Sequence, residues 1–125
     1  MLVSGKTVAF VPSRDLAGAE QFYVGVLGLA KLSGDPYGLV LEANGVTVRI
    51  ARTESLEPQP FTILGFDVTD VEQTARALAA QGVTFQRYPS MKQDELGIWS
   101  SPGGSRIAWF KDPDGNTLSV AQHPG

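Results

Sequence analysis

Residues 8–16 read Val-Ala-Phe-Val-Pro-Ser-Arg-Asp-Leu, and the pattern returns 55 residues later, where residues 63–71 read Ile-Leu-Gly-Phe-Asp-Val-Thr-Asp-Val. Each copy is typical of a strand that is followed by an acidic helix cap and an amphipathic helix, and about three more strands follow each copy. The repeat therefore predicts an α+β fold in which two βαβββ modules form a curved mixed sheet around a concave cup, with the helices on the outside. A cup of this kind is a natural ligand site.

The composition is that of one folded domain of ordinary size. The chain has 125 residues, of which 42% are hydrophobic and 18% are charged, and its formal net charge is -3. Because this balance provides no basic surface for phosphates, we expect no nucleic-acid partner. No apolar run approaches the roughly 20 residues that span a bilayer and no signal peptide is visible, so we expect no membrane partner and a cytoplasmic location. The absence of cysteine excludes disulfides and thiolate chemistry.

The predicted domain covers residues 1–125. Module one extends over about residues 6–53, a proline-containing connector over 54–60, and module two over about 61–122. Asp15 and Asp70 are typical helix N-caps, and Gly28 and Gly82 are expected to end the two helices.

The strands are separated by turn signals. Asn44-Gly45 is the strongest hairpin signal in the chain. We expect turns at 34–36 and 112–115, a loop at the rim over 90–96, and a frayed tail over 123–125. The predicted strands lie at residues 7–12, 29–33, 37–43, 46–52, 61–67, 83–88, 97–101, 105–111 and 116–121.

Strand alternation assigns the side chains of these strands to two faces. One set is apolar throughout and is expected to pack on the helices: Ala9, Val11, Leu39, Leu41, Val46, Val48, Ile50, Leu64, Phe66, Ala108, Phe110, Leu118 and Val120. The other set mixes aromatic, aliphatic and polar groups: Val8, Phe10, Val40, Glu42, Thr47, Arg49, Ile63, Gly65, Ile107, Trp109, Thr117 and Ser119. Such a mixture suits a ligand cavity. A half-solvated sheet face or a dimer interface is the alternative explanation.

Three ordered motifs resemble those of the vicinal oxygen chelate superfamily, which includes glyoxalase I, extradiol dioxygenases, fosfomycin-resistance enzymes and bleomycin-resistance proteins. They are residues 10–16, the pair Phe22-Tyr23 followed by residues 26–29, and residues 109–116, which read Trp-Phe-Lys-Asp-Pro-Asp-Gly-Asn. The resemblance covers about residues 7–122. Because these motifs build helix caps and turns, they indicate the fold and say little about the substrate.

The resemblance implies a divalent metal in the cup, and the matching ligand positions in this chain are Val8, Arg49, Ile63 and Ser119. None of these is a usual metal ligand, since valine and isoleucine have no donor atoms, arginine repels a cation and a single serine binds weakly. The only histidine is His123, near the end of the chain. We therefore expect neither a metal nor another cofactor.

Glu42 and Arg49 are weak candidates for catalysis. They lie diagonally across the Asn44-Gly45 hairpin, where a cross-strand ion pair is the simplest expectation. Alternatively, Arg49 binds a substrate carboxylate or phosphate and Glu42 acts as a general base. Ser100 and Ser101 have no histidine nearby in the predicted arrangement, which argues against a nucleophilic triad.

Aromatic side chains are the best candidates for ligand contact. Trp109 offers a large flat surface on the cup face, and Trp99 is a second candidate that equally well fills space in the core. Met91 is a possible lid residue. The full predicted ligand set is Phe10, Tyr37, Arg49, Tyr88, Trp99, Trp109 and Ser119.

Two classes of function remain open. The lack of metal ligands favours a metal-free protein that binds an aromatic or amphipathic small molecule, similar to the drug-sequestering members of the superfamily. The alternative is a glyoxalase- or dioxygenase-type enzyme, a lyase, isomerase or oxygenase with a lost or non-standard metal site. In either case we expect a homodimer, because modules of the superfamily often pair across subunits.

Overall fold

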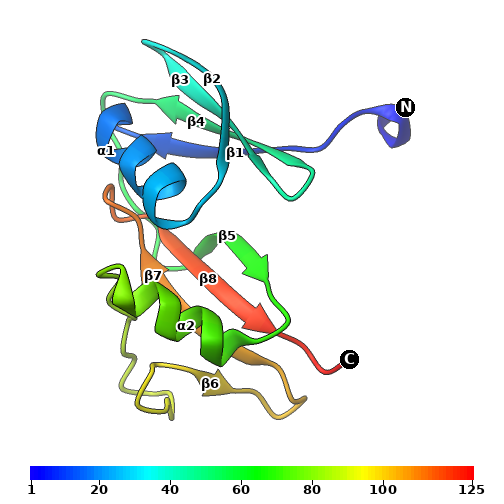
Figure 1. The fold of residues 1–125 in the computed structure, drawn as a ribbon, viewed down its shortest axis with the longest axis vertical. Helices are drawn as coiled ribbons and strands as arrows, with labels where there is room; N and C mark the ends of the chain where they lie inside the picture. Colours follow the sequence, from blue (N-terminus) through cyan, green and yellow to red (C-terminus); the bar gives the residue numbers. More distant parts are fainter. The chain divides into compact units, whose positions relative to one another are not determined.

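The computed structural model describes residues 1–125, which form two compact units, Met1–Glu57 and Pro58–Gly125 (Figure 1). Each unit contains one four-stranded mixed sheet and one α-helix. The predicted α+β class and the strand-helix-strand order of the two modules are thus confirmed. No helix in the structure has the length and apolar character that a membrane span requires.

The first unit has the strand order β1-β4-β3-β2, in which β1 and β4 are parallel and the other pairs are antiparallel. Pro12 is tolerated in β1 because that strand lies at the edge of the sheet. A 3₁₀ turn at Leu2–Ser4, which the sequence did not indicate, precedes the sheet. The elements are β1 (Val8–Ser13), α1 (Leu16–Glu20), β2 (Ala30–Asp35), β3 (Gly38–Ala43) and β4 (Val46–Arg52).

The first helix changes its hydrogen-bonding pattern halfway. Asp15 caps it as predicted, its carboxylate accepting a hydrogen bond from the Gly18 N–H. After α1 the chain continues as a π-helical segment, Gln21–Val26, and the Leu27 N–H donates to the Phe22 carbonyl, five residues back. A regular α-helix to Gly28 is therefore wrong for the second half, where a glycine among β-branched residues weakens the α-helical preference.

Both turns of the first sheet are explained by local chemistry. Asn44 and Gly45 have φ values of 48° and 88°, the primed turn that joins β3 to β4 as predicted. At the other end of β3, the strand β2 extends to Asp35, whose carboxylate accepts hydrogen bonds from the N–H groups of Tyr37 and Gly38. The strand therefore ends, and the turn begins, two residues later than the sequence suggested.

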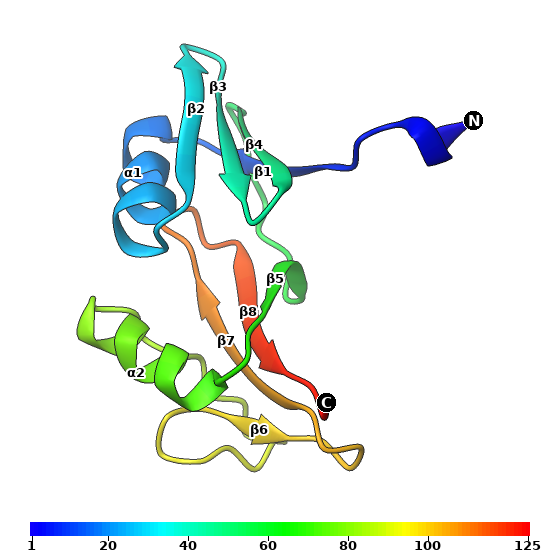
Figure 2. The ribbon, with the colours of Figure 1, turned by 45° about the vertical axis from the view of Figure 1, so that its right-hand side comes forward.

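The second unit has the order β5-β8-β7-β6, with β5 and β8 parallel. Asp70 caps α2 by accepting from the Gln73 N–H, and α2 packs against β7 and β8 (Figure 2). The elements are β5 (Thr62–Asp67), α2 (Val71–Ala80), β6 (Trp99–Ser100), β7 (Arg106–Lys111) and β8 (Thr117–Gln122).

Two predicted strands of the second unit need correction. Residues 83–88 form no strand, because their contact with β7 is limited to a bridge between Phe85 and Phe110 and one hydrogen bond from the Gln86 N–H to the Trp109 carbonyl. The strand predicted at 97–101 shrinks to β6, since Gly97 adopts a left-handed φ of 95° and lies against Phe85. A side chain at Gly97 would meet the Phe85 Cβ at 2.9 Å.

The alternation of buried side chains agrees with the predicted faces in β3, β4 and β7, whereas β8 is buried on both faces, with Thr117 and Ser119 of the mixed set also buried. Trp109 is half-buried, whereas its neighbours Ala108 and Phe110 are completely buried. Val46 is an exception: it follows the hairpin turn directly and is 42% exposed. The buried members of the apolar set are Val11, Leu39, Leu41, Val48, Ile50, Ala108, Phe110, Leu118 and Val120.

A buried acidic turn joins β7 to β8. One oxygen of the Asp112 carboxylate accepts from the N–H groups of Asp114 and Asn116, at 3.0 and 2.9 Å. The other oxygen accepts from the Asn116 side-chain amide at 2.9 Å. Because all three residues are buried, no water replaces these bonds. The turn thereby fixes the register between β8 and β7, the strand that carries Trp109.

We predict that Asp112→Ala destabilises the second unit by roughly 2–4 kcal/mol, because several buried donors lose their acceptor. Urea unfolding followed by tryptophan fluorescence reports on this unit, since both tryptophans, Trp99 and Trp109, belong to it. The control is Asp70→Ala, which removes an exposed helix cap and is expected to cost only about 1 kcal/mol. If the two variants lose the same free energy of unfolding, the buried turn contributes no more to stability than an exposed helix cap does.

Candidate functional site

Three hollows contain predicted ligand aromatics, and the one with the greatest volume of the three, about 400 Å³, lies in the second unit. That size falls within the range of small-molecule sites. The predicted ligand residues Tyr88 and Trp109 both line it. The complete lining is Pro60, Phe61, Thr62, Tyr88, Ser90, Met91, Trp109 and Thr117.

The aromatic rings of this hollow, which we call the Trp109 hollow, meet at well-defined angles. The rings of Tyr88 and Trp109 are nearly perpendicular, at 87°, with centroids 5.7 Å apart. The Trp99 ring lies 6.2 Å from that of Trp109 at an angle of 38°. Two perpendicular rings form a corner in which a planar molecule can stack on one ring and meet the edge of the other.

Hydrogen bonds to Gln93 hold the segment that carries Tyr88 and Met91. The Gln93 side chain accepts from the Tyr88 N–H and donates to the carbonyls of Gln86 and Gly97, each at 2.8 Å. The Arg87 guanidinium adds bonds to the carbonyls of Asp94 and Glu95. The predicted rim loop is thus well anchored. Its polar composition gave no sign that Gln93 is the residue that positions Tyr88.

A second, shallower hollow of about 180 Å³ lies in the first unit. It contains the predicted ligand residues Phe10, Tyr37 and Arg49, and Phe10 and Arg49 are register partners across β1 and β4. Phe10 is 64% exposed and Tyr37 is 81% exposed. The predicted ligand wall is therefore divided between hollows of the two separate units.

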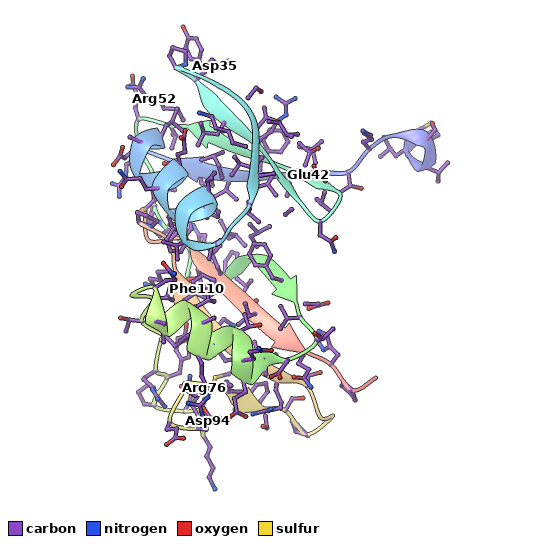
Figure 3. All side chains as sticks on the ribbon, viewed as in Figure 1. Asp35, Glu42, Arg52, Arg76, Asp94 and Phe110 are labelled. Carbon is purple, nitrogen blue, oxygen red and sulfur yellow. The ribbon has the colours of Figure 1, made fainter.

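The cross-strand ion pair expected between Glu42 and Arg49 is not formed. Glu42 is the register partner of Thr47, and Arg49 that of Val40, so the two charges are diagonal neighbours with no bond between them. Figure 3 shows Glu42 near the β3–β4 hairpin, at the opposite end of β3 from Asp35. Both charged side chains are exposed. Because exposed ion pairs gain little over hydration, nothing holds the two together.

The two remaining predicted ligand residues lie outside both hollows. Trp99 lines a third hollow, of about 320 Å³, together with Lys92, Gln93, Asp94, Ile98 and Ser100. Ser119 is buried, and a Cβ built on Gly65 would lie 3.0 Å from its hydroxyl oxygen. Ser119 is the register partner of Trp109 on the neighbouring strand β8.

The residues at the family's metal positions do not fit a divalent ion. Val8 and Ile63 have no donor atoms, Arg49 carries a positive charge and Ser119 offers one buried hydroxyl. Within either unit, no three side chains of histidine, cysteine, aspartate or glutamate come close enough together to hold a metal. A metal-dependent step has no support in this set of side chains.

The tail expected to be frayed is tied down at His123. The Ser105 Oγ lies 2.8 Å from His123 Nδ1, and His123 Nε2 lies 3.1 Å from an Asp67 carboxylate oxygen. The order hydroxyl, imidazole, carboxylate is that of hydrolase triads. The histidine side chain is 50% exposed and that of the aspartate 76%, and none of the three hollows includes them. We assign this chain of bonds to anchoring the end of β8.

Solved structures similar to this chain share its fold. A superfamily member from Sphaerobacter thermophilus is 22% identical, with a TM-score of 0.75 and coverage of 98% of this chain and 100% of that chain. A lactoylglutathione lyase from Agrobacterium tumefaciens is 17% identical (TM-score 0.73; 95% and 93% covered). A fosfomycin resistance protein from Listeria monocytogenes is 15% identical (TM-score 0.75; 97% and 94% covered).

These identities are too low to transfer an activity, and no curated protein matches the sequence. The family model described as the glyoxalase/bleomycin resistance protein/dioxygenase superfamily matches residues 7–120, which is nearly the whole chain. That match agrees with the two βαβββ units and with the motifs at the helix caps and at the Asp112 turn. The chain therefore belongs to the glyoxalase/bleomycin resistance protein/dioxygenase superfamily.

Proposed function

We propose that this protein binds an aromatic or amphipathic small molecule in the Trp109 hollow without a metal ion. The observation that carries the proposal is the perpendicular pair of Tyr88 and Trp109, which line a hollow of about 400 Å³. Four hydroxyl-bearing residues complete the lining and offer hydrogen bonds to a bound molecule: Thr62, Tyr88, Ser90 and Thr117.

The opposite face of the same strand supports this assignment. Phe110 is completely buried and its ring contacts that of Phe85 at 5.8 Å. Trp109, one residue earlier, is half-buried and faces the hollow. A large aromatic side chain that is left partly exposed beside a cavity has surface to bury against a ligand.

An enzyme of glyoxalase or dioxygenase type is the second candidate, with chemistry based on Arg49 and Glu42. One observation favours it: neither side chain takes part in an ion pair, so the guanidinium is available to a substrate anion and the carboxylate to a proton. Both are exposed in the first unit. Exposure in water weakens both roles, so we rank this candidate below ligand binding.

We further propose that the protein forms a homodimer. Strand β2 lies at the edge of its sheet, pairs only with β3, and exposes all six of its residues. Leu32, on this strand, is 57% exposed. An open edge with an apolar side chain is a surface that proteins commonly cover by association.

Replacement of Trp109 by alanine is predicted to weaken ligand binding by about 1–3 kcal/mol, because it removes the main stacking surface. The ligand is first identified by a thermal-shift screen of metabolites and antibiotics, and the variant is then titrated by calorimetry.

The matched control is Phe110→Ala, on the opposite face of β7. We expect it to cost about 3–5 kcal/mol of folding stability, more than Trp109→Ala does. If Trp109→Ala proves the more damaging to stability and leaves binding intact, the assignment of the two faces is wrong.

The second prediction concerns metal. Protein purified from medium that contains zinc, iron, nickel and manganese is expected to carry none of them in stoichiometric amount, because the mapped positions lack donors. A chelator should leave the melting temperature unchanged. Elemental analysis that finds one ion per chain contradicts the metal-free assignment and favours the enzymatic candidate.

The third prediction concerns assembly. Light scattering at tens of micromolar is expected to give twice the mass of one chain. Leu32→Lys, which places a charge on the exposed edge strand, should shift the mass toward the monomer. A monomeric mass for the unaltered protein rejects the dimer.

A further inference from the structure

We infer that the Trp109 hollow takes an aromatic anion, with the ring on Trp109 and the negative group toward the ammonium of Lys111; this inference rests on the proposed ligand-binding function. No charged side chain lines the hollow itself. The rings and hydroxyls of the lining therefore suit the uncharged body of a ligand. The preference of the hollow for one ligand charge is instead set by the charged residues at the two ends of β7 and β8.

Strand pairing places Lys111 next to the lining. Lys111 is two residues beyond Trp109 on β7, so both side chains belong to the same face of the sheet. It is also the register partner of Thr117, which lines the hollow. Directly opposed residues of antiparallel strands have Cβ atoms about 5 Å apart. The four-carbon side chain of Lys111 thus starts within reach of the mouth of the hollow.

The ammonium of Lys111 has no partner in the protein. Lys111 is exposed and takes part in no ion pair or side-chain hydrogen bond. The nearest carboxylate in sequence, Asp112, is instead occupied by the donors of its own turn. The other cations of the second unit differ: all three arginines, Arg76, Arg87 and Arg106, are engaged with carboxylates or carbonyls. Lys92 lines the third hollow.

Charge on this sheet face is therefore distributed unequally. Lys111 lies at the end of the pair β7–β8 that carries the hollow. The carboxylate of Asp67 lies at the other end, opposite Ala121 on β8, where it bonds to His123. Thr117 and Ala121 are four residues apart, or roughly 13 Å along an extended strand. An aromatic anion is thus attracted to one end of the hollow and repelled from the far end of the sheet.

Three probes with the same ring test the inference: naphthalene-2-carboxylate, naphthalene-2-carboxamide and 2-naphthylmethylammonium. Calorimetry on the unaltered protein is expected to show the carboxylate binding roughly five- to tenfold more tightly than the carboxamide, and the ammonium most weakly. Raising the salt concentration should reduce the difference in affinity between the carboxylate and the carboxamide. A carboxamide that binds as tightly as the carboxylate overturns the inference.

The variant Lys111→Met keeps the unbranched shape and most of the length of the side chain and removes its charge, and Lys92→Met is the matched control. Lys111→Met is expected to abolish the preference for the carboxylate while the carboxamide binds as before. Lys92→Met should retain the preference. If Lys111→Met leaves the preference intact, Lys111 does not recognise the anion and the inference is wrong.

The two proposals fail in distinguishable ways. If all three probes bind equally and Trp109→Ala removes that binding, the ligand-binding function stands and the role of Lys111 is rejected. If no probe binds in a manner that depends on Trp109, both are rejected.

Discussion

The candidate site depends on the burial of Phe110 and Leu118, which face each other across β7 and β8 and are completely buried. Because side chains alternate along a strand, burying this pair places Trp109 and Lys111 on the other face of the sheet. Their register partners, Ser119 and Thr117, lie on that same face. A slip of one residue would exchange the two faces and bury the lysine. The packing of the core thus decides which side chains share a face with the hollow.

Two local devices hold that register and complete the hollow. The buried Asp112 turn saturates its own donors and so fixes where β8 begins. Gln93 holds the backbone of an irregular segment by bonding to three backbone groups. Because residues 83–88 form no strand, the bonds of the Gln93 side chain hold the backbone at Tyr88 in place of the hydrogen bonds of a sheet. A lining held in this way would lose little conformational entropy of its own if the proposed ligand binds.

The metal ligands that the resemblance to the superfamily implies are missing from the corresponding positions of this chain. The fold is shared with a lactoylglutathione lyase and a fosfomycin resistance protein, but Val8 and Ile63 supply no donor atoms where the resemblance implies metal ligands. What remains is a set of aromatic rings, hydroxyls and a few unpaired charges. Rings and hydroxyls can bind and orient a molecule, whereas the two candidates for acid–base chemistry, Glu42 and Arg49, are both exposed to solvent. These observations are the reason why we propose ligand binding ahead of catalysis.

The repeat, the aspartate caps, the Asn44-Gly45 turn and the alternation around Trp109 follow from the sequence alone, because each depends on residues that are close together in the chain. The tertiary structure decided what depends on distant residues. It showed that Glu42 and Arg49 do not pair, that Gln93 holds Tyr88, that His123 is tied to Ser105 and Asp67, and that the strand predicted at 83–88 does not form. The physical reason is that the periodicity of a strand shows on which face a side chain lies. The partners of that side chain depend on how distant segments pack together, and this packing leaves no pattern in the local sequence.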